Sequence, residues 1–268
     1  MKSSGLNLVF LLLSLCMLVA AAAAASSSVG ISSAAAVASG TPPQDVSEYI
    51  SEARAAVAGQ NWTGALLVTT RGTAWYPDNA ELLCLQGYSH RKMGQYAQAV
   101  DEVSRAIPLD PKPVRFANRG YAYLALKNYT AALADADAGI ALNATYPVSY
   151  GVKALALQGV GRNSDALAAM ETALTLAPDS AHYWHIKGRI LASQGDCSGA
   201  AAALEKSVEL DQNYVLPWPG FGSASENLAT LKAGCSAVPS GTTPAKSPLG
   251  WIAVAALAGA AIAYCPRR

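Results

Sequence analysis

Residues 184–200 read WHIKGRILASQGDCSGA, a stretch with the pattern of one helix–turn–helix unit. Gly188 precedes Ala200 by twelve positions, and the pair Gly195–Asp196 lies between them. Small residues let two helices approach closely, and a glycine can adopt the left-handed backbone that ends a helix. The stretch therefore predicts two antiparallel helices joined by a turn at Gly195.

The same pattern recurs at intervals of about 34 residues, which is typical of a helical repeat protein. The small residue returns as Gly87, Gly120, Ala154 and Gly188, and the alanine as Ala65, Ala99, Ala132, Ala166 and Ala200. The predicted units span 46–79, 80–112, 113–146, 147–180 and 181–214. Gly94, Gly161 and Gly195 are expected to end first helices, and Pro77, Pro111 and Pro178 to stop second helices. Because one helix pair cannot bury its apolar face alone, the units are expected to stack around a continuous core.

These residues, with Trp184, Leu191 and Leu109-Asp110-Pro111, resemble the tetratricopeptide repeat (TPR). The resemblance implies an all-α fold, a right-handed superhelical solenoid of about five helix-turn-helix TPR units plus a C-terminal capping helix over 217–234. The chain departs from the family pattern where Ala144 and Gln212 replace the usual proline. Thr69 and Gly72 also weaken the first unit.

The N-terminus reads as a targeting segment. Lys2 is followed by a nearly unbroken apolar run from Leu6 to Ala25, and then by serines. A basic start, an apolar run and a small-residue site are typical of a secretory signal peptide. The run is also long enough to remain as a signal anchor if it is not cleaved.

The C-terminus also carries an apolar segment, from Trp251 to Tyr264, followed by Pro266-Arg267-Arg268. Interfacial aromatics and terminal arginines are typical of a short transmembrane segment with a cytoplasmic basic end. A buried C-terminal helix is the alternative. The ending resembles the tripartite sorting tails of prokaryotic, particularly archaeal, surface proteins. Both ends predict a cell-membrane protein whose body lies on the extracytoplasmic side.

The predicted organisation follows from these segments. It comprises a signal peptide or anchor (1–25), a low-complexity linker (26–45), the TPR solenoid with its cap (46–234), a Pro/Ser/Thr linker (235–248), a transmembrane segment (249–265) and a basic tail (266–268). The linkers lack the apolar residues needed to offset ordering entropy and are expected to act as spacers.

Sequons and cysteines fit an oxidising compartment. Asn61, Asn128 and Asn143 begin N-x-[S/T] sequons at turns of the repeat pattern, where glycosylation is permitted. Cys197 and Cys235 fall at positions that stacked helices bring together, so a disulfide is expected, with two free thiols as the alternative. Cys84 is expected to be a small buried residue within a helix.

Composition and motifs favour a non-enzymatic protein. Charged residues form 14% of the chain and the net charge is +1, which gives no electrostatic footprint for nucleic acid. No catalytic constellation, cofactor motif or small-molecule site is found. His182 and His185 lie three residues apart but lack a third metal ligand nearby, and Asp135 and Asp137 are expected on a solvated helix face. We therefore predict no metal and no cofactor.

In the TPR family, particular positions of the first helices line a peptide-binding groove. The resemblance carries this role to Arg54, Glu81, Tyr88, Arg91, Asn118, Tyr121, Gln158, His182, His185 and Arg189. Tyrosines can supply anchoring area and arginines can pair carboxylates, although some of the tyrosines could instead pack between repeats. The predicted function is a tethered scaffold that binds a protein or peptide partner. The alternative is an accessory subunit of a cell-envelope assembly or secretion machine.

Overall fold

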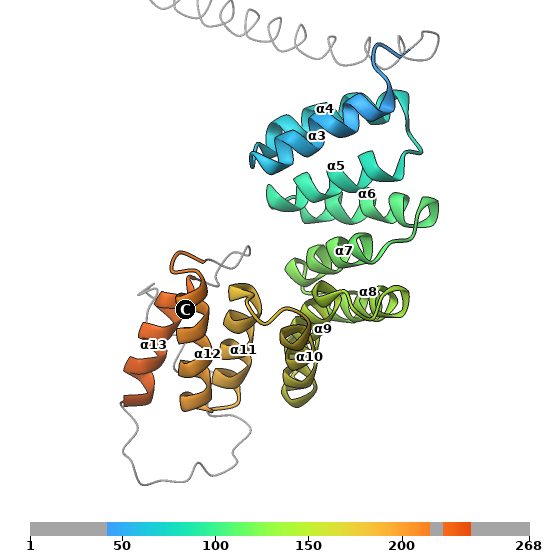
Figure 1. Ribbon diagram of the computed structural model, residues 1–268. Coiled ribbons are helices and arrows are strands. Elements are labelled where there is room, and N and C mark those ends of the chain that lie inside the picture. The colour runs from blue at the N-terminus through green and yellow to red at the C-terminus, as the bar shows by residue number, and fades with distance from the viewer. Residues whose placement is uncertain (1–41, 215–221, 237–268) are drawn as a thin grey trace, which may run out of the picture. The chain divides into compact units, whose positions relative to one another are not determined.

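A computed structural model describes residues 42–214 and 222–236 (Figure 1). Eleven helices cover these residues and follow one another as sequential helix pairs. The predicted fold class, an all-α TPR-like solenoid, is confirmed. The chain divides into two compact units, and the division falls after Ala122.

Unit 1 contains two complete helix pairs and most of a fifth helix. The helices are α3 (Val46–Ala58), α4 (Trp62–Trp75), α5 (Ala80–Lys92), α6 (Tyr96–Leu109) and α7 (Pro113–Ala125), whose last residues belong to unit 2. In each complete pair the two helices pack against one another along their length (Figure 1).

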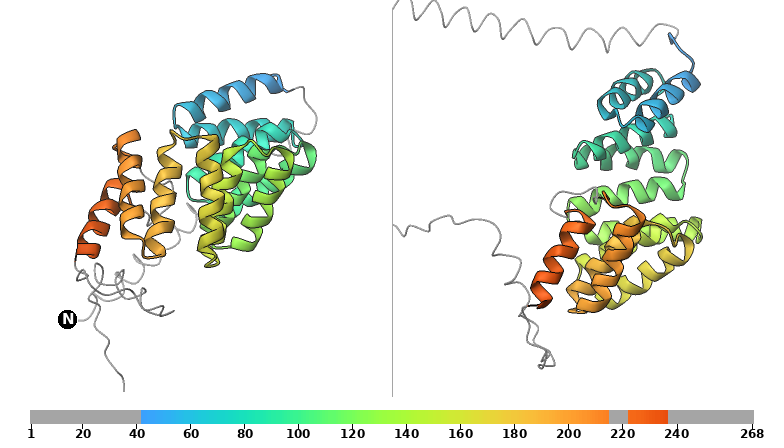
Figure 2. Two further views of the ribbon diagram at one scale, coloured as in Figure 1. Left: turned by 60° about the horizontal axis from the view of Figure 1, so that its bottom comes forward. Right: turned by 60° about the vertical axis from the view of Figure 1, so that its left-hand side comes forward.

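Unit 2 contains the remaining six helices. They are α8 (Tyr129–Leu142), α9 (Pro147–Gly159), α10 (Asn163–Leu176), α11 (Ala181–Ser193), α12 (Cys197–Leu210) and α13 (Ala224–Ser236). The last three helices lie side by side, with α12 between α11 and α13 (Figure 2). Every first helix, in both units, begins at the first residue of a predicted repeat.

The helices of a pair meet at the predicted small residues. A Cβ atom on Gly87 would lie 2.6 Å from Val103 and 3.1 Å from the carbonyl oxygen of Ala99. A Cβ atom on Gly188 would meet Leu204 at 2.7 Å and the carbonyl oxygen of Ala200 at 3.1 Å. A Cβ atom at either position would force Val103 or Leu204 to shift, so glycine is favoured at these two helix contacts.

The turn inside each repeat contains one residue with a positive φ. Gly94, Gly161 and Gly195 take this conformation, with φ between 77° and 81°, as predicted. In the other two repeats the same position is held by Gln60 (φ 55°) and Lys127 (φ 59°), which the sequence did not predict. A left-handed backbone is unfavourable for a residue with a Cβ atom, so these two turns are strained.

Proline is not what ends the second helices. α4, α6 and α10 end two residues before Pro77, Pro111 and Pro178, as predicted. However, α8 and α12 end at the equivalent residues, although Ala144 and Gln212 replace the proline there. The turn that follows each helix is therefore sufficient to stop it.

The capping helix starts later than predicted. A helix over 217–234 was expected; residues 217–221 lie outside the described residues, and in the described part Gly222 has a φ of +62° and α13 begins at Ala224. The Ser223 hydroxyl accepts a hydrogen bond from the Glu226 amide (3.1 Å), and the Glu226 carboxylate accepts one from the Ser223 amide (2.8 Å). This reciprocal pair is a capping box, which fixes the start of the helix at this point.

Asp135 corrects a second expectation. Its side chain is buried, with 4% of the residue exposed, whereas Asp137 is exposed and pairs with Lys153. Two residues that are two positions apart on a helix point in different directions, so only one of them could remain on the solvated face.

Among the residues in the two described ranges, no helix is long and apolar enough to span a membrane. The predicted signal or anchor (1–25), most of the linker over 26–45, the linker beyond Ser236, the transmembrane segment (249–265) and the basic tail (266–268) lie outside the described residues.

Candidate partner-binding faces

The predicted face residues of unit 1 centre on a cation held between aromatic rings. The guanidinium carbon of Arg91 lies 4.9 Å from the ring centroid of Tyr88 and 5.3 Å from that of Tyr121. Its Nη2 atom donates a hydrogen bond to the side-chain oxygen of Asn118 (3.4 Å). Burial lowers the pKa of Arg91 below its ordinary value, although nearby tyrosines partly offset this effect. The structure thus brings together four of the predicted residues, from α5 and α7.

A second cation extends this group toward α4. Lys92 Nζ lies 5.4 Å from the ring centroid of Trp62 and 5.6 Å from that of Tyr88, and the two rings meet edge to face at 5.9 Å. Burial, and secondly the charge of Arg91, lowers the pKa of Lys92. We name Trp62, Tyr88, Arg91, Lys92 and Tyr121 the Arg91 cluster. Trp62 and Lys92 were missed because the repeat pattern assigns them no groove position.

The Arg91 cluster carries two neighbouring positive charges. Within the part of the chain that the structure describes, neither Arg91 nor Lys92 forms an ion pair with a carboxylate. Cations stacked on aromatic rings gain roughly 0.5–2 kcal/mol, depending on their exposure. Tyr121 is buried, whereas the other four residues of the cluster are half-buried, so these four present positive charge and aromatic surface together.

The other predicted residues of unit 1 form ion pairs beside the cluster. Arg54 contacts Glu81 at 2.9 Å, and the second Glu81 oxygen lies 3.4 Å from Arg115. Arg115 also contacts the Asp110 carboxylate at 2.8 Å, and only 1% of its side chain is exposed. Arg115 was not predicted, because its burial depends on carboxylates from two other elements.

Cys84 has a free, buried thiol, as expected. The side-chain amide of Asn118 donates to its sulfur at 3.7 Å. Burial raises the pKa of Cys84, an effect that the hydrogen bond from Asn118 opposes. A buried thiol with a raised pKa is a poor nucleophile, so Cys84 acts as packing.

The predicted face residues of unit 2 are covered from within the same unit. A hydrogen bond of 2.6 Å joins His182 Nδ1 to the Tyr214 hydroxyl, and one of 2.7 Å joins His185 Nε2 to the Asn227 side chain on α13. His185 is fully buried, so it offers no surface to a partner. These contacts fasten Tyr214 and α13 onto α11.

Burial sets the ionisation of this covered group. It lowers the pKa of His185 to about 4, with a smaller contribution from the charge of Arg189, and it lowers the pKa of Arg189 to about 10. Because its pKa is lowered, His185 is neutral and supports the packing of unit 2.

Gln158, the remaining residue of the predicted binding face, is half-buried on α9.

The three sequon asparagines are exposed at helix ends. Asn61 and Asn128 precede α4 and α8, and their side-chain oxygens accept hydrogen bonds from the amides of Gly64 (2.9 Å) and Ala131 (3.2 Å). Asn143 follows α8 and accepts from the Thr145 amide at 2.9 Å. All three asparagines are exposed, and each uses its side-chain oxygen for the hydrogen bond. A glycan would be attached to the side-chain nitrogen.

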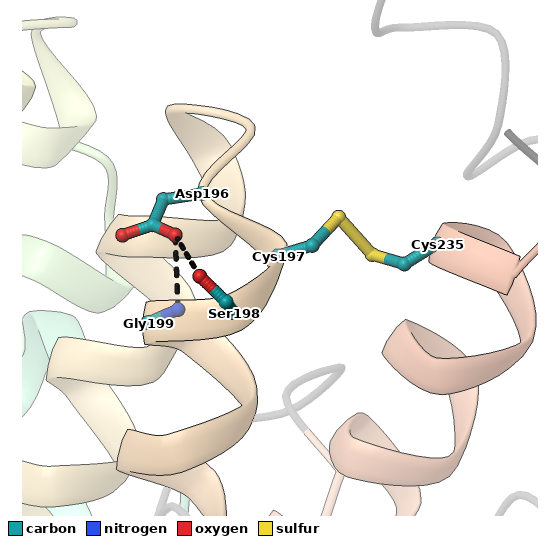
Figure 3. The surroundings of a disulfide bond; sticks show 5 residues. All are labelled: Asp196, Cys197, Ser198, Gly199 and Cys235. Carbon is teal, nitrogen blue, oxygen red and sulfur yellow. Dashed lines mark hydrogen bonds between the residues drawn. A yellow bond between two sulfur atoms is a disulfide. The ribbon is translucent and has the colours of Figure 1, made fainter. Parts of the chain in front are cut away.

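The predicted cysteine pair joins two helices of unit 2. Cys197 begins α12, Cys235 lies near the end of α13, and the structure joins them by a disulfide (Figure 3). The preceding Asp196 carboxylate accepts hydrogen bonds from the Gly199 amide (2.9 Å) and the Ser198 hydroxyl (3.1 Å). The disulfide is thus attached to a capped helix start.

Comparison with known proteins agrees with the stacked helix pairs. Residues 84–147 and 152–215 match the tetratricopeptide repeat family. The chain resembles a thermophilic TPR protein of Thermus thermophilus, with 17% identity, a TM-score of 0.61, and coverage of 70% of this chain and 100% of that one. It also resembles residues 41 to the end of MamA from Desulfovibrio magneticus RS-1, with 21% identity, a TM-score of 0.53, and coverage of 64% and 98%.

The chain matches only part of the length of its curated relatives. Mouse RNA polymerase II-associated protein 3 is 30% identical over 135 residues, which cover 48% of this chain and 20% of that protein. Serine/threonine-protein phosphatase T of Trypanosoma brucei brucei is 34% identical over 103 residues, which cover 38% and 21%. Residues 84–147 and 152–215 of this chain of sequential helix pairs are therefore TPR repeats. TPR domains bind protein partners.

Proposed function

We propose that the chain is a non-enzymatic scaffold whose unit 1 binds a peptide segment of a partner protein at the Arg91 cluster. The observation that carries this proposal is the Arg91 guanidinium held between Tyr88 and Tyr121. Tyrosine, tryptophan and arginine are the residues that most often dominate binding energy at protein interfaces. The face of unit 2 is the weaker candidate, because Tyr214 and α13 cover its histidines.

A peptide library tests this proposal directly. The purified chain would be used to select binding peptides, and their affinities would be measured by calorimetry. Replacing Tyr88 by alanine is expected to weaken binding by at least tenfold, the usual scale for a hot-spot residue. Tyr150→Ala in unit 2 is the matched control and should bind as the unchanged protein does. If Tyr88→Ala retains full affinity at unchanged helix content, the cluster is not the peptide site.

We further propose that the scaffold works outside the cytoplasm, held at the membrane by its C-terminal segment. Support comes from the order of features along the sequence: the basic and apolar start, the spacers, the apolar end and the terminal arginines. Exposed sequons and a disulfide suit such a compartment.

Cell fractionation and surface proteolysis test this location. The full chain should sediment with membranes and be cut by protease added to intact cells. A chain truncated after residue 248 should be released into the medium. Protection of the full chain from external protease would contradict the proposed location.

A further inference from the structure

Unit 2 contains two open grooves that repeat one another. The α8–α10 groove lies over α9 and has a volume of about 520 Å³, and the α10–α12 groove lies over α11 and has about 570 Å³. Every lining residue of the first groove has a counterpart in the second, 34 residues later in the chain. The two cavities are therefore the same site built twice, on either side of α10.

The paired positions share their chemistry. At three equivalent positions the grooves share an aromatic ring (Tyr150 or Trp184), a lysine (Lys153 or Lys187) and an acid (Asp137 or Glu171). Lys153 contacts Asp137 at 2.8 Å, and Lys187 lies 3.7 Å from Glu171. Some other lining positions differ between the grooves, since Arg162 corresponds to Asp196 and Thr172 to Lys206.

The Trp184 ring is held in place, with Lys187 Nζ 5.4 Å from its centroid, and both grooves are kept open. The Trp184 indole N–H donates to the Pro178 carbonyl oxygen at 2.7 Å, which fixes the plane of the ring. Ala168 and Ala202, which are exposed, occupy equivalent positions in the lining and fill little of the space. Leu157 and Leu191 add an apolar floor. Volumes of this size are within the range of small-molecule sites.

The charges of each groove cancel. The α8–α10 groove has two acids and two bases in its lining, and so does the α10–α12 groove. A surface without net charge gives no long-range attraction to a polyanion or a polycation. Its ligand should therefore be neutral, with groups that both donate and accept hydrogen bonds.

The lining also disfavours an extended peptide. Helices supply most of the lining residues of both grooves, and the backbone amides within a helix are already hydrogen-bonded to one another. A peptide strand would find no sheet edge to pair with. A sugar ring, by contrast, has apolar C–H faces that pack on an aromatic ring and hydroxyl groups that can bond a carboxylate and an ammonium group.

We propose that the α8–α10 and α10–α12 grooves bind neighbouring units of a neutral oligosaccharide chain. Tyr150 and Trp184 would pack against successive sugar rings, and each acid–lysine pair would bond their hydroxyl groups. A polymer of identical units suits a site that is itself repeated. This activity is independent of peptide binding by the Arg91 cluster, which lies in unit 1.

Calorimetry with the full chain and three neutral probes, cellohexaose, mannohexaose and chitohexaose, tests the proposal. At least one hexasaccharide should bind saturably, and more tightly than its own monosaccharide. Trp184→Ala and Tyr150→Ala should each weaken this binding by about tenfold. Tyr88→Ala in the Arg91 cluster is the matched control and should leave it unchanged.

Filling the grooves provides a second perturbation that removes no packing contact. Ala168→Phe and Ala202→Phe place a ring at exposed positions and should each weaken binding at least as much, even if an aromatic deletion disturbs folding. The proposal is overturned if no hexasaccharide binds below about 10 mM, or if the filled variants bind as the unchanged chain does. It is also overturned if a neutral Gly-Gln repeat peptide binds and is the ligand that these variants lose.

Discussion

The first helices of the two units carry similar polar and aromatic residues but use them differently. In unit 1, Tyr88 and Tyr121 hold Arg91, and no carboxylate pairs with it in the described chain. In unit 2, His182 and His185 bond Tyr214 and Asn227 and become part of the packing. In unit 2 the additional helix α13 thus covers a face that the sequence predicts to bind a partner. The hydrogen bond from Asn227 to His185 shows this contact.

The largest expected effect on stability comes from replacing Arg115, which holds the ion pairs beside the unit 1 face. Arg115→Met removes the buried cation that contacts Glu81 and Asp110, leaving both carboxylates without it. Only the guanidinium is buried, and a hydrogen bond to a charged group is worth about 1.5–3 kcal/mol, so urea denaturation should show a loss of about 3 kcal/mol in the free energy of unfolding. Arg105→Met, which removes an exposed pair with Glu102, is the control and should cost under about 1 kcal/mol. Equal losses in the two variants would show that Arg115 has no special role.

The second expected effect is a pH dependence of stability, caused by the buried His185 of unit 2. The pKa of His185 is lowered to about 4 from an ordinary 6.5, so between these values the unfolded chain binds a proton that the folded chain does not. Stability therefore falls as the pH drops through this window, by about 3 kcal/mol at most. The groups that face the His185 imidazole are Arg189, Tyr214 and Asn227.

The control for this pH effect is His185→Gln, which keeps a side chain able to bond Asn227 but does not titrate. Thermal denaturation at several pH values should show a shallower slope between pH 6.5 and pH 4.5 for the variant. An identical slope in both proteins would mean that carboxylates, rather than His185, cause the pH dependence.

The smallest expected effect on stability comes from the turn residues with a positive φ, and it should be similar in the two units. Gln60→Gly in unit 1 and Lys127→Gly in unit 2 relieve a left-handed backbone and should each raise the free energy of unfolding by about 0.5–1 kcal/mol. Gly94→Ala introduces the same strain where no atom lies within 4 Å of the added Cβ, and it should lower stability by about 1 kcal/mol. Thermal melts of the three variants measure both signs. A stabilised Gly94→Ala would show that φ strain is not the controlling factor.

The repeat pattern predicted the fold because its main determinants are local or separated by one period. Gly87 opposite Ala99, and Gly195 at its turn, follow from the spacing alone. The strained Gln60 and Lys127 could not be predicted, because neither residue favours a left-handed backbone and only its position in the repeat imposes one.

The sites were harder to predict because they depend on which helix covers which face. His185 was assigned to a groove by its offset, but Asn227, 42 positions away, buries it. Arg115 was passed over because a charged residue near a helix start usually faces water, and its carboxylates come from two other elements. The two unit 2 grooves were also missed, since their lysines and acids read individually as solvated surface residues.

The disulfide between Cys197 and Cys235 has a mechanical consequence. If the chain is pulled from its two ends, tension passes through the sulfur atoms from the start of α12 to the end of α13. Residues 198–234 then carry no load, and α13 cannot be peeled away by force applied beyond it. An array of stacked helices ordinarily yields from its end under load, but here a pull on the C-terminus cannot unravel α12 or α13 until the sulfur–sulfur bond is reduced.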